Sequence, residues 1–150
     1  MEKREMTGGC QCGRVRYRAQ VDPEQAYLCH CRMCQRATGG VAAAFVNLPR
    51  DAVVWESGPD WYASSPIARR PFCSHCGSPL GFQFLEGENM DLTVGSFDES
   101  YAFAPHWHFS AETIHEDWRT DVGDPLRDRF GGLFPFLRPA KTGGGQDEKA

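Results

Sequence analysis

The chain has 150 residues, a length that fits one domain with its own hydrophobic core. Its net charge of −4 and its 41% of hydrophobic residues indicate a globular protein, and the acidic balance disfavours nucleic acid as a partner. No apolar stretch approaches the length of a membrane span, and the charged residues 1–6 do not resemble a signal peptide, so we expect no membrane association and a cytoplasmic location.

Alternating and apolar runs predict seven or eight short strands. Over residues 14–19, Val15, Tyr17 and Ala19 alternate with arginines, which is typical of a strand with one buried and one solvated face. An apolar run over 40–48 ends at Pro49 and predicts a more buried strand. The remaining predicted strands cover 53–55, 61–63, 80–84, 92–94 and 106–109.

Helical patterns are weak and short. One turn of helix is predicted at 34–37 and another at 111–118, with no long stripe of period 3.6 and no internal repeat. The polar, glycine-rich residues 139–150 are expected to form a disordered tail. We therefore predict a mostly β fold, with one domain of short antiparallel strands and few short helices over residues 1–138.

The seven cysteines form three tight groups with none left over: Cys10 and Cys12; Cys29, Cys31 and Cys34; Cys73 and Cys76. In a reducing compartment, clustered thiols indicate metal binding, and an odd total argues against a paired disulfide framework. A redox pair at Cys73 and Cys76 is an alternative, but their motif lacks the strand-then-helix context of such pairs.

Spacing suggests how these thiols divide between metal ions. The first and third groups each run into a glycine and precede a strand, so they can meet and complete a closed, structural four-thiolate zinc site. The middle group offers three thiols within six residues, and no eighth cysteine exists to complete its tetrahedron. We predict two zinc ions per chain, one structural and one catalytic with an open fourth position.

Two alternatives remain for this division. His30 or His75 could supply the fourth ligand of the middle group and make that site structural, although His30 would point away if both of its neighbours bind the metal. Alternatively, Cys29 or Cys31 could belong to the four-ligand site.

Three thiolates on Zn²⁺ leave a net charge of −1, which makes the ion a weak activator of water but a suitable partner for a sulfur ligand. A bound thiol would be held as its nucleophilic thiolate. The reactions that follow are addition of a thiol to an aldehyde and cleavage of the adduct, both of which need a proton-transfer group. The candidates are His30, His75, His106 and His108.

The three cysteine motifs, Gly9–Gly13, Cys29–Gly39 and Phe72–Leu80, resemble those of the glutathione-dependent formaldehyde-activating enzyme family, which includes centromere-protein-V-like proteins. Gly95–Asp98 and His106–Phe109 resemble its weaker closing motifs. The resemblance implies a two-zinc, mostly β fold of the β-tent type. It implies a structural zinc at Cys10, Cys12, Cys73 and Cys76, and a catalytic zinc at Cys29, Cys31 and Cys34.

The activity that the resemblance implies is that of a carbon–sulfur lyase forming or cleaving S-hydroxymethylglutathione, with a small thiol such as glutathione and a small aldehyde as substrates. The alternatives are a non-enzymatic zinc module that binds a protein, and a methionine sulfoxide reductase, which would need a cysteine not bound to metal. Trp107 and Trp118 flank the histidine-rich segment and are candidates for a place near the second zinc. Four arginines could pair with the carboxylates of glutathione: Arg32, Arg36, Arg69 and Arg70.

Overall fold

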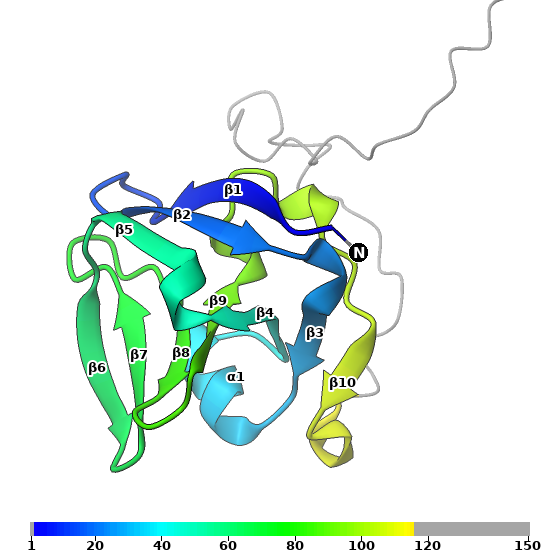
Figure 1. Ribbon diagram of the computed structural model, residues 1–150. Coiled ribbons are helices and arrows are strands. Elements are labelled where there is room, and N and C mark those ends of the chain that lie inside the picture. Colours follow the sequence, from blue (N-terminus) through cyan, green and yellow to red (C-terminus); the bar gives the residue numbers. More distant parts are fainter. Residues whose placement is uncertain (1, 116–150) are drawn as a thin grey trace, which may run out of the picture. The chain divides into compact units, whose positions relative to one another are not determined.

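The computed structural model describes residues 2–115, which form ten strands, one α-helix and five short 3₁₀ segments (Figure 1). The predicted tail over 139–150, the end of the predicted domain and Trp118 lie outside the described residues. Within the described part of the chain, no helix has the length and apolarity needed to cross a membrane.

The strands form two sheets. The smaller sheet is antiparallel and comprises, in spatial order, β1 (Arg4–Gly9), β2 (Arg16–Val21) and β5 (Val53–Ser57). The larger sheet comprises, in spatial order, β10 (Trp107–Phe109), β3 (Ala26–Cys29), β4 (Ala43–Pro49), β9 (Asn89–Thr93), β8 (Gly81–Phe84), β7 (Ala68–Phe72) and β6 (Asp60–Ser65). Its pairs are antiparallel except that of β10 with β3, which is parallel.

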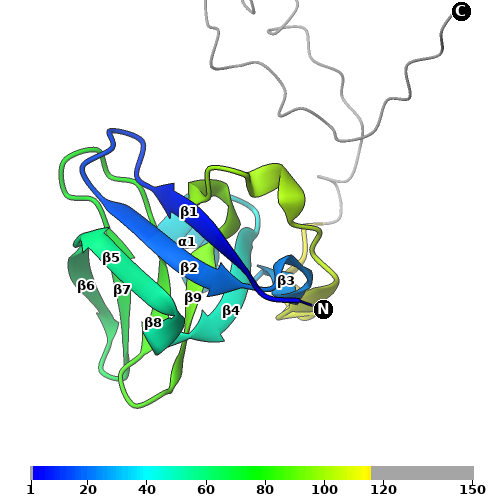
Figure 2. The same cartoon turned by 45° about the horizontal axis from the view of Figure 1, so that its top comes forward.

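The helix and the 3₁₀ segments lie in the connections between strands. The helix α1 (Arg32–Thr38) joins β3 to β4 and packs against β4. Figure 2 shows β1 and β2 crossing in front of α1 and β9. The 3₁₀ segments are η1 (Pro23–Gln25), η2 (Arg50–Ala52), η3 (Val94–Ser96), η4 (Ser100–Ala102) and η5 (Ala111–Thr113).

The main core contains side chains of both sheets. Tyr17 and Ala19 of β2 are buried, as the alternation predicted. The Tyr17 ring packs edge-on against Trp55 and Phe97, each with ring centroids 5.4 Å apart. Such edge-to-face contacts add to the free energy gained by removing aromatic area from water. The alternating pattern therefore places one face of β2 in the core.

The arginines on the other face of β2 are paired with carboxylates. The Arg16 guanidinium donates to Asp98 at 2.9 Å, and the Arg18 guanidinium donates to Glu56 at 2.9 Å. Arg14, just before the strand, is likewise paired with a carboxylate. Each of these positive charges therefore has a carboxylate partner, as is typical of a solvated strand face.

Three strands were not predicted from the sequence: β1, β3 and β7. Their residues lack clear alternation because β1 is mostly polar, β3 ends in a thiol and β7 contains two arginines. The predicted helical turn at 34–37 is part of the longer helix α1. The predicted turn at 111–118 corresponds in part to η5, and its residues from 116 onward lie outside the described residues.

Candidate metal centres and a thiol-lined cavity

Cys10, Cys12, Cys73 and Cys76, here called the four-thiol set, come together with their Sγ atoms within 4.8 Å of one another. The Sγ of Cys12 lies 3.5 Å from that of Cys10 and 3.8 Å from that of Cys73. Four sulfurs around a tetrahedral zinc, each at about 2.3 Å, lie about 3.8 Å apart. The spacing therefore fits a zinc-sized ion.

Two similar turns present these thiols. In the first, the Gly13 N–H donates to the Cys10 carbonyl at 3.1 Å; in the second, the Gly77 N–H donates to the Cys73 carbonyl at 2.7 Å. Both glycines have a left-handed backbone conformation, with φ of 81° and 78°. Any other residue would be strained in this conformation. The Val15 N–H also donates to the Cys10 Sγ at 3.2 Å, a contact that stabilises a thiolate.

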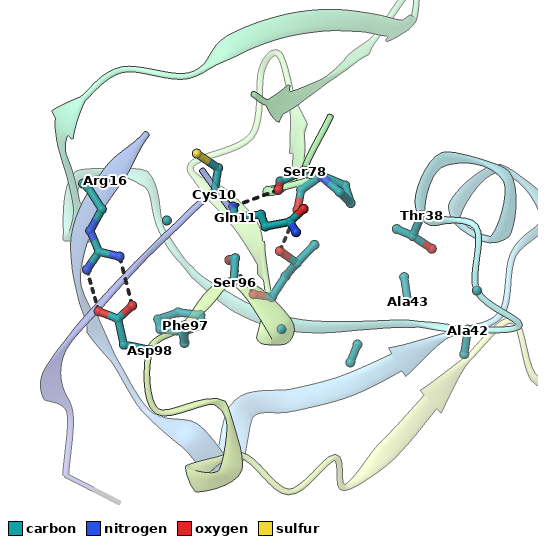
Figure 3. Close-up of a pocket in the computed structure, with 16 residues that line it drawn as sticks. Cys10, Gln11, Arg16, Thr38, Ala42, Ala43, Ser78, Ser96, Phe97 and Asp98 are labelled. Atoms are coloured by element: carbon teal, nitrogen blue, oxygen red, sulfur yellow. Dashed lines mark hydrogen bonds and ion pairs between the residues drawn. The ribbon is translucent and has the colours of Figure 1, made fainter. Parts of the chain in front are cut away.

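Arg14 adds a positive charge to the four-thiol set, because its Nε donates to the Cys73 Sγ at 3.4 Å. A cavity of about 570 Å³ lies beside the set, and Figure 3 shows Cys10 and Gln11 on its wall with the Arg16–Asp98 pair at one end. Cys10 is the only member of the set among the residues that line it. A metal held by all four sulfurs would have no position left for a ligand from this cavity.

Cys29, Cys31 and Cys34, here called the three-thiol set, also have their Sγ atoms within 4.8 Å of one another. Cys29 ends β3, Cys31 is the N-cap of α1, and Cys34 lies in the first turn. The Cys34 N–H donates to the Cys31 Sγ at 3.3 Å, so a thiol takes the place of the usual capping oxygen. This cap explains why the helix begins two residues before the predicted turn. Burial raises the pKa of the Cys31 thiol, but backbone and side-chain hydrogen bonds outweigh it, and the pKa falls below its usual value.

No fourth protein ligand joins the three-thiol set within residues 2–115. All five histidines of the chain lie in this part, and neither a histidine nor a carboxylate belongs to either set. The His30 Nε2 lies 2.8 Å from the His108 Nδ1, and the His30 N–H donates to the Phe109 carbonyl at 2.9 Å. His30 therefore joins β3 to β10, whereas His75 is exposed in the turn of the four-thiol set.

The three-thiol set lines a cavity of about 870 Å³, here called the thiol-lined cavity. Its wall is mostly aromatic and aliphatic, and none of the four candidate histidines lines it. Trp107 lines the same cavity as the three-thiol set, and its ring stacks on that of Tyr27 with centroids 5.5 Å apart. The polar side chains of the wall include Tyr27, Asn47 and Asp91.

Asp91 is the acidic group of this wall. The Tyr27 hydroxyl and the Asn47 amide both donate to its Oδ1 at 3.0 Å. Burial raises the pKa of the Asp91 carboxyl above its usual value, despite these hydrogen bonds, which lower it. Burial also raises the pKa of Tyr27, so its hydroxyl remains a donor at neutral pH. We did not predict Asp91 from the sequence, because a polar residue between Met90 and Leu92 fits ordinary strand alternation and gives no sign of burial.

Arg70 is the arginine that contacts the three-thiol set. It is 7% exposed, and its Nη2 donates to the Cys34 Sγ at 3.5 Å while its Nε donates to the Ser64 Oγ at 3.1 Å. Its guanidinium carbon lies 4.9 Å from the centre of the Phe82 ring. Since a divalent ion with three thiolates carries a net charge of −1, this cation would bring the local sum to zero. Its neighbour Arg69 instead covers the Trp61 ring at 4.0 Å.

With this geometry, the sequence can be compared with those of known proteins. Residues 5–113 match the family of glutathione-dependent formaldehyde-activating enzymes. The chain belongs to this family. The match confirms the resemblance seen in the three cysteine motifs, and it includes every cysteine described above.

This member of the formaldehyde-activating enzyme family is similar to a Schizosaccharomyces pombe protein and to a Rhodobacter sphaeroides protein of known structure. The first is an uncharacterized lyase of Schizosaccharomyces pombe, 31% identical over 85 residues, which are 57% of this chain and 62% of the yeast protein. The match thus spans less than two thirds of that relative. The second is a Rhodobacter sphaeroides protein whose crystal structure has a TM-score of 0.52 at 22% identity, covering 62% of this chain and 88% of the other. At that identity the likeness shows a shared fold.

Proposed function

We propose that the protein is a zinc-dependent carbon–sulfur lyase that forms or cleaves a thiol–aldehyde adduct. The observation that carries the proposal is that the three-thiol set lines a cavity of about 870 Å³ and gains no fourth ligand from residues 2–115. Membership of the formaldehyde-activating family supports a thiol and an aldehyde as substrates, with S-hydroxymethylglutathione as the adduct that its description suggests. The yeast relative, named as a lyase, supports the reaction class.

The division of labour proposed for the metals follows the two sets. The four-thiol set would hold a structural zinc, and Cys29, Cys31 and Cys34 would hold a catalytic one. A zinc ion bound by three thiolates supplies a fourth position for the sulfur of a thiol and favours its thiolate form. Arg70 would compensate the negative charge of the three-thiol set, so that a further anionic sulfur meets less repulsion.

Asp91 is our candidate for the proton-transfer residue, in place of the histidines. In cleavage, the hydroxyl proton of the adduct moves to the Asp91 carboxylate, the C=O bond forms, and the C–S bond breaks with its electrons going to sulfur. In the forming direction the protonated Asp91 returns the proton to the aldehyde oxygen. A carboxyl whose pKa is raised by burial is better matched to this role near neutral pH than an exposed one. Tyr27 and Asn47 would hold the carboxyl in position.

The proposed compartment is the cytoplasm, because a reducing environment keeps seven thiols available for metal ions. The pairing of the β2 arginines with carboxylates supports a small-molecule substrate over nucleic acid.

The test is the visible spectrum of the cobalt-substituted protein during a titration with glutathione. Thiol binding should intensify the sulfur-to-cobalt bands of one of two tetrahedral sites, and Cys31→Ser should abolish that response. Two tetrahedral sites that do not respond to any thiol would contradict the lyase and favour a non-enzymatic module that binds a protein partner.

A further inference from the structure

The chemistry of the thiol-lined cavity bears on which adduct it accepts. Aromatic rings come to its wall from four strands: Tyr27 from β3, Phe45 from β4, Phe82 from β8 and Trp107 from β10. Two ring pairs stiffen this wall, since Tyr27 stacks on Trp107 and Phe82 packs edge-on against Phe84 at 4.9 Å. A rigid wall of this kind favours an apolar, ring-sized group.

The charges around the thiol-lined cavity also favour an uncharged ligand. Among the described residues that line it, Asp91 is the only carboxylic acid, and the other acidic groups are the three thiols and Tyr27. No lysine or arginine is among these lining residues. Arg70 reaches the Cys34 Sγ but lines a different cavity. The Arg70 cation is already shared between the Cys34 Sγ and the Asp91 carboxylate, so a further carboxylate placed here would lie near thiolates and Asp91 with no cation on the cavity wall to offset its loss of water. Glutathione carries two carboxylates.

Exposed apolar side chains also gather at this cavity. Five of its lining side chains are large, apolar and between 41% and 65% exposed: Met33, Ile67, Phe84, Trp107 and Phe109. They come from α1, β8, β10 and the turn between β6 and β7, so distant segments converge on one apolar rim. Apolar surface gathered beside a cavity is typical of a site that binds an apolar ligand.

We infer that the thiol-lined cavity accepts a thiol–aldehyde adduct whose substituent is uncharged and aromatic in size, in preference to one that carries carboxylates. Asp91 supplies the polar contact for the adduct hydroxyl, because both hydrogen bonds from described residues go to its Oδ1 and leave Oδ2 for a ligand. The inference rests on the proposed function, since the sulfur of the adduct must reach the three-thiol set.

Three thiols test the inference on the cobalt-substituted protein: phenylmethanethiol, its 4-carboxylate derivative and glutathione. The first two share the ring and the thiol and differ by one carboxylate. We expect phenylmethanethiol to half-saturate the spectral change at a concentration at least tenfold lower than either of the other two. Quenching of tryptophan fluorescence, to which Trp107 contributes, gives a second readout that does not depend on the metal bands.

A charge introduced at the rim should shift this preference. Ile67→Lys places a cation at a 65% exposed position of the cavity, and we expect it to reduce the gap between the ring thiol and its carboxylate at least threefold. Val54→Lys, at a 50% exposed position of β5 that does not line the cavity, is the matched control and should leave the gap unchanged.

The outcomes separate this inference from the proposed function. Equal or tighter binding of glutathione or the carboxylate derivative overturns the substrate class while the spectral response still supports the lyase. If no thiol changes the cobalt spectrum, the proposed function fails and the inference fails with it.

Discussion

The Arg70 guanidinium donates a hydrogen bond to the Cys34 Sγ at 3.5 Å, and both side chains are buried. The contact joins β7 to α1 through two residues that are 36 apart in the sequence. A buried cation is stable only where opposite charge and hydrogen bonds replace its water. Arg70 meets this need through its contact with the Cys34 Sγ and through the charge of the Asp91 carboxylate, whose pKa it lowers.

Arg70→Met should weaken metal binding at the three-thiol set by about tenfold or more, as loss of partners to metal ligands does. Competition with a chromophoric chelator measures this loss as a change in the affinity of the weaker of two zinc ions. Arg69→Met is the matched control, because Arg69 covers Trp61 and does not contact a thiol. Equal losses in both variants would contradict a specific role for Arg70.

Cys12→Ser and Cys31→Ser should have different effects. Cys12 belongs to the set that joins two distant turns, so its loss should unfold or aggregate the protein, since a structural zinc contributes on the order of 10 kcal/mol to folding. Cys31→Ser should leave a folded protein with one zinc per chain. Circular dichroism and metal analysis measure the two properties, and similar unfolding of both variants would refute the division of labour.

Asp91→Asn should raise stability and lower activity. Because burial raises the pKa of Asp91, the unfolded state ionises first as pH rises above about 4, so this group's contribution to stability is full at low pH and is lost as pH rises through the raised pKa. At pH 7 the variant, which carries no charge there, should therefore unfold at a higher denaturant concentration than the parent protein. Denaturant unfolding of the zinc-loaded protein measures the gain.

The pKa of each aspartate can be measured separately by following the NMR chemical shift of its carboxyl carbon as the pH changes. Asp91 should titrate above the usual value, and Asp98, whose pKa is lowered by its hydrogen bond with Arg16, should titrate below it. An Asp91 that titrates at or below the usual value would remove the basis for both the stability gain and its role as proton-transfer residue.

Gly81→Ala should destabilise the fold by ~2 kcal/mol or more, as overpacking against fixed backbone does. A Cβ at Gly81 would lie 2.1 Å from the Asp91 carbonyl oxygen, so β8 and β9 would have to separate. Gly95→Ala is the control, because a Cβ there meets nothing within 4 Å. Thermal unfolding compares the two, and an equal shift in Tm would show that the close approach of β8 to β9 does not matter.

The sequence predicted those strands in which apolar residues alternate with polar ones or form a continuous apolar run. The alternation at Val15, Tyr17 and Ala19 reflects burial of one strand face, so β2 was predictable. The strand β7 was not predictable, because Arg70 is buried there by contacts with Ser64 and Cys34 that only the folded chain brings together.

The candidate site was predictable to a similar extent. The short spacings of the cysteines constrain which thiols can meet, and the structure brings together the same sets. The residues around them come from strands distant in sequence, so Asp91 and Arg70 could not be assigned a role from local pattern. The histidines that the sequence favoured do not line the thiol-lined cavity.

The two thiol sets differ in how much of the chain must be in place before each is complete. Cys29, Cys31 and Cys34 are neighbours, so even an unfolded chain pays little loop entropy to gather them. Cys12 and Cys73 are 61 residues apart, and their meeting requires the sheets between them. During synthesis, a metal ion can therefore reach the local thiols before residue 73 exists. The three-thiol set would then fill first, although the four-thiol set matters more for the fold. Metal captured early would not by itself commit the chain to its native structure.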